Sequence, residues 1–104
     1  MKLIDLNPKW YGSGGKGHTD KDGNTLPRRE GLGITFNCPC GCSDQLAVSF
    51  TNPLDGQPPR DGHTWQRTGD TFETLTLSPS LLRSKDKGGC GWHGWVRNGQ
   101  IITC

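Results

Sequence analysis

The chain has 104 residues, which is the length of one domain, and its formal net charge of +2 is too small to indicate nucleic-acid binding by itself. Hydrophobic residues make up 30% of the chain, glycine occupies 16 positions, and the mean hydropathy is -0.69. We therefore treat residues 1–104 as a single domain with a thin core. A core this poor in apolar side chains needs another source of stability, such as disulfides, a bound metal or oligomerisation.

The cellular compartment is predicted from the thiols and from the apolar runs. No run approaches the roughly 18 residues of a membrane-spanning helix, so we expect no membrane association. The first ten residues are interrupted by Asp5 and Asn7, unlike a secretory signal. Five cysteines are an odd number, which argues against a secreted disulfide framework. We expect a cytoplasmic protein with reduced thiols.

The first third of the chain holds two predicted segments. Residues 2–6 are typical of a short strand that Pro8 ends. Residues 12–30 contain many glycines and charges and hardly any apolar side chains. This composition predicts a mobile, Gly-rich loop.

The next segment predicts a β-hairpin with thiols at its tip. Residues 33–38 alternate, so that Ile34, Phe36 and Cys38 share one face of a strand, and residues 45–50 alternate in the same way. The sequence Cys-Pro-Cys-Gly-Cys, residues 38–42, lies between the two strands.

The second half of the chain is predicted to be mostly strands and loops. Residues 51–63 hold prolines and glycines and predict a loop, whereas residues 65–67 and 71–77 predict strands. Residues 81–84 have room for one helical turn at most. Residues 92–97 and 100–103 flank Asn98-Gly99, a strong signal for a type I′ hairpin turn. The fold class is therefore mainly β, with small antiparallel sheets or hairpins, long loops and little helix.

The cysteines at residues 38–42 predict a metal site together with Cys90 and His93. A structural zinc ion takes four thiolate or imidazole ligands, usually as two close pairs. Cys90 and His93 form a pair with two-residue spacing. Two of Cys38, Cys40 and Cys42 would complete the site, and the spacing leaves open which two. Cys104 is predicted not to be a ligand.

Other uses of the thiols are free cysteines, a disulfide or redox chemistry. Zinc is favoured over an iron–sulfur cluster because a histidine is available. A closed structural site is favoured over a catalytic one, because the metalloprotease sequence HExxH and the zinc deaminase signature are both absent.

A predicted strand near the C-terminus also offers a binding surface. Alternation places His93, Trp95 and Arg97 on one face and Trp92 and Val96 on the other. If one face packs on the core, Trp95 and Arg97 on the other can contact a partner, since aromatic and Arg side chains stack on nucleic-acid bases and cover protein surfaces.

Three segments together resemble a family of small uncharacterised bacterial and phage proteins. They are the Cys-Pro-Cys-Gly-Cys turn within residues 36–42, the Thr-Leu-x-x-Ser-Pro-Ser-Leu region of residues 74–81, and the Cys-x-x-His–aromatic strand of residues 90–99. The resemblance covers residues 34–104. It implies a zinc-binding β fold encoded by prophages and mobile elements, in a bacterial cell or a phage-infected host. In that family Cys90 and His93 match one ligand pair, and two of the clustered cysteines match the other.

These observations predict a non-catalytic, zinc-binding domain that acts as an interaction module for an unidentified protein or nucleic acid. The alternative is a zinc-dependent hydrolase with an open metal position, in which His63 or His18 assists the reaction. A coordination count distinguishes the two, because a catalytic zinc keeps one position for water.

Overall fold

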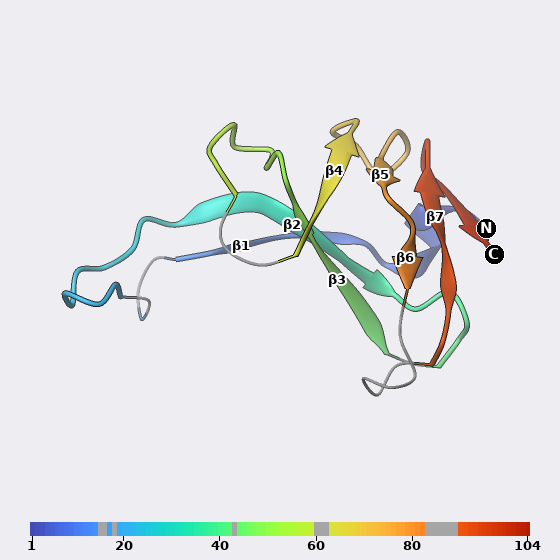
Figure 1. Cartoon of the computed structure of the whole chain (residues 1–104), viewed down its shortest axis with the longest axis horizontal. Helices are drawn as coiled ribbons and strands as arrows, with labels where there is room; N and C mark the ends of the chain where they lie inside the picture. The colour runs from blue at the N-terminus through green and yellow to red at the C-terminus, as the bar shows by residue number, and fades with distance from the viewer. Residues whose placement is uncertain (15–16, 18, 43, 60–62, 83–89) are drawn as a thin grey trace.

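The computed structural model describes residues 1–14, 17, 19–42, 44–59, 63–82 and 90–104, and it extends over 44 × 30 × 21 Å. A long hairpin points away from the rest of the molecule, and the two termini lie near each other at the opposite end (Figure 1). The elements in chain order are a 3₁₀ helix η1 (Leu3–Leu6) and the strands β1 (Lys9–Ser13), β2 (Arg29–Asn37), β3 (Gln45–Phe50), β4 (Thr64–Thr68), β5 (Thr76–Ser78), β6 (Leu81–Leu82), β7 (His93–Arg97) and β8 (Gln100–Thr103).

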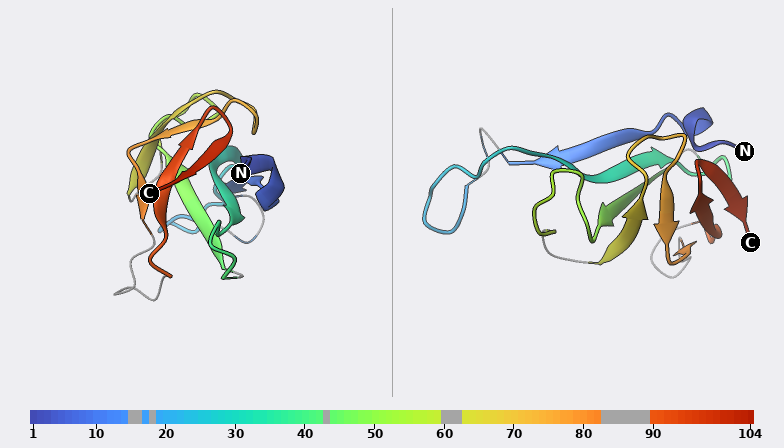
Figure 2. Two further views of the ribbon diagram at one scale, coloured as in Figure 1. Left: turned by 90° about the vertical axis from the view of Figure 1, so that its right-hand side faces the viewer. Right: turned by 90° about the horizontal axis from the view of Figure 1, so that it is seen from above.

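Within the described residues these strands form two sheets, so the prediction of a mainly β protein is confirmed. The first sheet has five strands in the order β1-β2-β3-β4-β5, and the second has three in the order β6-β7-β8. Strands β3 and β4, which residues 51–63 connect, pair in parallel. All the other pairings are antiparallel. The second sheet lies beside one end of the first (Figure 2).

The core lies between the two sheets. Alternating residues of β2 and β3 supply one side of it, including Ile34, Phe36 and Val48, which are almost fully buried. Leu81 and Val96 supply the other side from the second sheet. The predicted hairpin at residues 33–50 is confirmed, and β2 begins earlier than expected, at Arg29.

The N-terminal prediction was wrong, because residues 3–6 form a turn of 3₁₀ helix instead of a strand. Leu3 and Leu6 are three residues apart and both are buried, which is the spacing that brings side chains together in a 3₁₀ helix. Before this helix, Lys2 pairs with Gln100, and the Ile101 amide donates to the Met1 carbonyl oxygen at 2.8 Å. The first residues thus cover the outer edge of β8.

Two further predictions around residues 71–84 need correction. Residues 71–74 form a turn in which the hydroxyls of Thr71 and Thr74 are 2.7 Å apart, so only Thr76–Ser78 is a strand. Threonine side chains that bond within a turn compete with the ladder of a sheet. Leu81–Leu82 pairs with β7 as a strand instead of starting a helical turn, and residues 83–84 lie outside the described residues.

The hairpin of β7 and β8 is confirmed, and two glycines set its geometry. Asn98 and Gly99 have φ values of 49° and 72°, as a type I′ turn requires. Gly94 lies in the middle of β7, where a Cβ atom would overlap the Ile102 carbonyl oxygen and the ring of Trp92. The strands β7 and β8 can therefore approach closely only because residue 94 has no side chain.

The segment 12–30, predicted to be a mobile loop, is partly in strands. Residues 12–13 end β1 and residues 29–30 begin β2. Between them, Thr19 pairs with Thr25, and Asp20 Oδ1 accepts hydrogen bonds from the amides of Asp22 and Asn24 at 2.9 Å. Residues 15, 16 and 18 lie outside the described residues, and the mobility of this segment stays a prediction.

Among the described residues, no helix has the length and apolar character needed to cross a membrane.

Candidate functional site: a thiol cluster beside a Ser–His pair

The thiol cluster forms where the turn after β2 meets the residues before β7. Cys38 follows β2 directly, and its amide donates to the Asp44 carbonyl oxygen at 2.8 Å. The Gly41 amide donates to the Cys38 carbonyl oxygen at 3.1 Å, and Gly41 has φ +85°, a conformation that glycine adopts without strain. This tight reversal turns Cys40 back towards Cys90.

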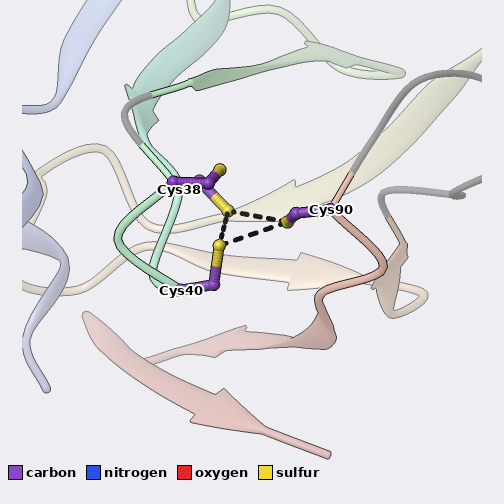
Figure 3. Close-up of side chains that lie close together, drawn as sticks. Cys38, Cys40 and Cys90 are labelled. Atoms are coloured by element: carbon purple, nitrogen blue, oxygen red, sulfur yellow. Dashed lines mark hydrogen bonds between the residues drawn. The ribbon is translucent and has the colours of Figure 1, made fainter.

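Four sulfur atoms converge at this place. The Sγ–Sγ distances are 3.3 Å for Cys38–Cys40, 3.4 Å for Cys38–Cys90 and 3.2 Å for Cys40–Cys90 (Figure 3). The Sγ atom of Cys42 joins them, and all four atoms lie within 4.8 Å of one another. Cys38 is buried and Cys90 partly buried, whereas Cys40 and Cys42 are exposed.

The distances fit a metal ion better than a disulfide. All five cysteines are free, and a disulfide bond is only about 2.05 Å long. Four sulfurs placed about 2.3 Å from a central zinc ion at tetrahedral angles would be roughly 3.8 Å apart. The three distances among Cys38, Cys40 and Cys90 are therefore slightly shorter than in a tetrahedral tetrathiolate, and the four cysteines could hold a metal ion.

Hydrogen bonding and burial give these thiols different pKa values. The backbone amide of Trp92, helped by the Cys40 thiol, stabilises the Cys90 thiolate and lowers the pKa of Cys90 to about 7. The pKa of Cys40 rises to about 12, mainly because its thiol hydrogen-bonds to Cys90 and Cys38. Burial raises the pKa of Cys38. A bound cation would displace the remaining protons, because thiolates and not thiols are metal ligands.

The positions of the cysteines and His93 can be compared with the predicted ligands, but they do not determine which residues bind a metal. All three cysteines of the 38–42 turn lie with Cys90, although only two were expected to be ligands. His93 is outside this group, and its Nε2 atom lies 2.9 Å from the Oγ atom of Ser80. Cys104 is exposed at the end of the chain, and its amide donates to the His93 carbonyl oxygen at 2.9 Å.

Ser80 and His93 are brought together by the pairing of β6 with β7. Leu81 pairs with Gly94 and Leu82 with His93, so Ser80 lies on the same side of the sheet as the imidazole. The indole Nε1 of Trp65 donates to the Ser80 carbonyl oxygen at 3.2 Å and holds this residue from the first sheet. A serine hydroxyl at hydrogen-bond distance from an imidazole is the arrangement of an activated nucleophile.

The other contacts of His93 come from its own sheet. Its ring lies 5.5 Å from the ring of Trp95 at an interplanar angle of 38°. In the part of the chain that the structure describes, no hydrogen bond joins His93 to a carboxylate. The pair is therefore a dyad within those residues.

Sequence analysis missed Ser80 because it assigned His93 to the metal on the basis of the Cys-x-x-His spacing. Ser80 lies in the Ser-Pro-Ser segment, and His93 in the Cys-x-x-His strand, both of which contributed to the family resemblance. The presence of both motifs was the only sequence signal that could have indicated a Ser80–His93 pair. Their contact depends on the β6–β7 register, which the sequence did not predict.

The remaining predicted residues are placed as follows. Trp95 and Arg97 lie on the outer face of β7, with the Arg97 guanidinium carbon 5.2 Å from the centre of the Trp95 ring. Their role in binding a partner stays a prediction. His63 is exposed and contacts the edge of the Trp65 ring, with ring centres 4.6 Å apart. His18 lies outside the described residues.

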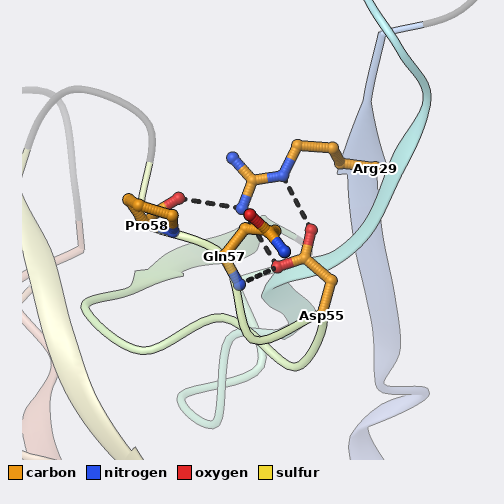
Figure 4. A network of polar contacts seen from close by, with 4 residues as sticks. All are labelled: Arg29, Asp55, Gln57 and Pro58. Atoms are coloured by element: carbon orange, nitrogen blue, oxygen red, sulfur yellow. Dashed lines mark hydrogen bonds and ion pairs between the residues drawn. The ribbon is translucent and has the colours of Figure 1, made fainter.

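A second polar cluster joins a loop to β2 and has a structural role. Arg29 donates from Nε and Nη2 to the two carboxylate oxygens of Asp55 at 2.7 and 3.0 Å, and from Nη2 to the Pro58 carbonyl oxygen at 2.8 Å (Figure 4). The Gln57 amide also donates to Asp55 Oδ1 at 3.0 Å. The Arg29 hydrogen bonds lower the pKa of Asp55 to about 2. Because each donor has its partner within the loop, this cluster fixes the 51–59 loop and leaves no group for chemistry.

The fold and the site define a small, mainly β protein with a cluster of four cysteines next to a serine–histidine pair. The family model described as "Bacterial ubiquitination-like system serine protease (BubE)" matches residues 16–104, so the chain belongs to this family. No curated protein and no solved structure matches the chain.

The match confirms the predicted resemblance only in part. The family is described as bacterial, and the matched residues of this chain include the cysteine cluster, whereas an origin in phages is not confirmed. The family is named for a serine protease, so the prediction of a non-catalytic module is unconfirmed. The zinc-dependent hydrolase, in which the metal would be catalytic, is not favoured.

The cluster predicts that one divalent metal ion binds per chain and stabilises the fold. Replacing Cys40 with Ser should lower the metal content and the melting temperature, since metal binding to a small domain contributes to its folding energy. A ligand at a thousandfold its Kd contributes about 4 kcal/mol, equivalent to roughly 15–30 °C for a domain of this size. Elemental analysis and thermal unfolding measure both effects. Cys104→Ser is the matched control, and equal metal content in the two variants would contradict a site at Cys40.

The Arg29–Asp55 pair predicts a stability difference that depends on pH. The folded-state pKa of Asp55 is about 2, below its ordinary value of 3.8, so its ionised form stabilises the fold above about pH 4. This contribution is lost as the pH falls through about 2. Asp55→Asn should therefore lower the urea midpoint slightly at pH 6, as exposed ion pairs do, and match the wild type near pH 2. The exposed Asp70→Asn is the control, and a difference independent of pH would refute the ionic contribution.

Proposed function

We propose that this chain is a serine peptidase of a bacterial ubiquitination-like system, with Ser80 as nucleophile and His93 as general base. The observation that carries the proposal is the 2.9 Å separation of Ser80 Oγ and His93 Nε2 in a member of a family named for a serine protease. Geometry of this kind is the first requirement for a general base.

The proposed reaction proceeds through an acyl-enzyme. With its ring proton on Nδ1, His93 accepts the Ser80 hydroxyl proton at Nε2 as Oγ attacks the carbonyl carbon of the substrate peptide bond. The resulting imidazolium then donates this proton to the leaving amine, and the C–N bond breaks. Water, deprotonated by His93 in the same way, hydrolyses the ester and restores the hydroxyl of Ser80.

The surroundings of the dyad support this assignment. Trp65 and β6 restrain the backbone on both sides of the Ser80 side chain, while Trp95 packs near the imidazole. Rigid support of both partners is what a catalytic pair needs, because small displacements weaken proton transfer.

The thiol cluster is proposed to be a closed, structural zinc site with Cys38, Cys40, Cys42 and Cys90 as ligands. His93 was expected to be a ligand, but the proposed reaction requires its Nε2 atom at Ser80. Four thiolates complete a tetrahedral shell and leave no position for substrate. Zinc would supply structure only, by holding the start of β7 against the turn after β2.

The substrate and the location are part of the same proposal. A protease of a ubiquitination-like system acts on protein, so the partner is a protein and not a nucleic acid. Free thiols and a zinc tetrathiolate are consistent with the reducing bacterial cytoplasm.

Covalent labelling tests the nucleophile. A fluorophosphonate forms a phosphorus–oxygen bond with an activated serine and releases fluoride, so the wild type should be labelled at Ser80. Ser80→Ala should abolish labelling, and His93→Gln should slow it at least about 10³-fold, as the loss of either partner does in serine hydrolases. Intact mass spectrometry measures the extent and rate.

Ser78→Ala is the matched control, because Ser78 lies on the other side of Pro79, is exposed and, among the described residues, has no hydrogen bond to His93. Its labelling should equal that of the wild type. Undiminished labelling of Ser80→Ala, in protein with unchanged thermal stability, would refute the proposal.

Metal exchange separates the serine mechanism from the zinc hydrolase. If the metal does not touch the substrate, replacing Zn²⁺ with Co²⁺ should leave the labelling rate of Ser80 unchanged within about twofold. Removal of the metal by a chelator should slow labelling in parallel with unfolding measured by circular dichroism. A rate that changes with the metal while the fold stays intact would favour a catalytic metal.

A further inference from the structure

The outer face of the second sheet carries exposed apolar side chains next to the dyad. Leu82 is 62% exposed and Ile102 is 38% exposed. Leu82 pairs with His93, and Ile102 pairs with the half-buried Trp95. Because cross-strand partners project to the same face, these side chains share the face of the imidazole. We call Leu82, Trp95 and Ile102 the apolar platform.

The platform is not needed for the core. The opposite face of the same strands buries Leu81, Trp92, Val96 and Ile101, each at most 7% exposed. In a chain that is only 30% hydrophobic, large apolar side chains left in solvent are costly, and two of the four that are exposed in the described residues lie on the platform. This placement beside the dyad indicates a binding surface.

Arg97 adds a positive charge at the end of the platform. It is exposed, it lies over the Trp95 ring, and it faces Gln100 across the hairpin. The two ion pairs found among the described residues involve Arg28 and Arg29, so within that part of the chain Arg97 has no carboxylate partner. A carboxylate of a bound molecule would complement it.

The distances between side chains along β7 predict how far from the scissile bond each substrate residue would bind. A strand advances about 3.3 Å per residue, so Trp95 lies about 7 Å from His93 and Arg97 about 13 Å. An extended peptide whose scissile bond is at Ser80 would meet the platform after two residues and Arg97 after about four.

From this geometry we infer a specificity that rests on the proposed peptidase function. The outer face of β6, β7 and β8 binds an extended segment of the substrate protein, with a bulky apolar residue about two positions from the scissile bond and an acidic residue about four positions from it. A second copy of the chain is a less suitable occupant, because it would cover the Ser80–His93 pair that opens on this face.

Internally quenched peptides test the inference in the full-length, metal-loaded protein. One series places Leu, Phe, Ala or Gly two positions from the bond, and another places Glu, Gln or Lys four positions from it, on either side. The wild type should cleave the Leu or Phe peptides with kcat/KM about tenfold above the Gly peptide. It should prefer Glu over Lys by about fivefold.

Two substitutions should change these preferences separately. Trp95→Ala should reduce the apolar preference to below about twofold, and Leu82→Ala provides a second test if Trp95→Ala does not fold. Arg97→Glu should invert the order of Glu and Lys peptides while keeping the apolar preference. Arg28→Glu is the matched control, since this exposed arginine directly precedes β2, whose first residues lie far from β7 (Figure 1), and its exchange alters the net charge equally.

Fluorophosphonate labelling separates the outcomes. If Ser80 is labelled but the preferences are absent, or are unchanged in Trp95→Ala and Arg97→Glu, the subsites are refuted while the peptidase stands. If Ser80 is not labelled, the proposed function itself fails. Sedimentation analysis tests self-association. If the wild type is a dimer that Leu82→Asp dissociates, and if the peptide preferences are the same in both, the platform is a dimer interface and the inference is overturned.

Discussion

The contact between Cys90 and the turn after β2 is the constraint on which the functional end of the molecule depends. It joins the residues before β7 of the second sheet to the tip of the β2–β3 hairpin in the first, across sulfur–sulfur distances of 3.2–3.4 Å. His93 follows Cys90 by three residues and begins β7. The position of the imidazole relative to Ser80 is therefore determined by a contact that takes no part in the proposed chemistry. A chain with few apolar residues can hold a catalytic pair in this way without a large core.

The same strand serves three purposes in succession. Cys90, three residues before the strand, belongs to the thiol cluster. The first residue of the strand, His93, is the proposed base, and its outward residues Trp95 and Arg97 line the proposed subsites. Its inward residues, including Val96, pack in the core. The alternation of a strand permits this division, since each neighbouring residue faces the other side. Binding, proton transfer and stability are thus coupled through one short element.

Sequence reasoning predicted the parts of the fold that depend on local pattern. The alternation of Ile34, Phe36 and Cys38 and the Asn98-Gly99 turn are properties of neighbouring residues, and both were confirmed. The helix at Leu3–Leu6 was missed because its three-residue spacing was not considered, and the turn at Thr71–Thr74 because its threonines were taken as strand-forming residues. In each case side-chain interactions outweighed the propensity of the backbone.

The site was predicted less completely because its parts meet only through tertiary structure. The thiols were selected from their spacing, and the structure brings Cys90 together with all three of them in a cluster that could hold a metal ion. Ser80, the proposed nucleophile, has in contrast no neighbour in the sequence that marks it. Its contact with His93 arises from the pairing of Leu81 with Gly94, and a two-residue strand is too short to show a pattern. The Cys-x-x-His spacing pointed to His93, and its role as a metal ligand stays a prediction that the proposed function replaces with that of a base.

Gly94 supports the proposed active site without belonging to the residues that would meet the substrate. A methyl group here would overlap the Ile102 carbonyl oxygen and the Trp92 ring, and β7 would have to move outwards from β8. Catalytic pairs tolerate displacements of only about 0.5 Å, so this movement would separate His93 from Ser80. The close approach of β7 to β8 thus fixes the position of the imidazole. The missing side chain at residue 94 is therefore as necessary to the proposed catalytic pair as the Ser80 hydroxyl.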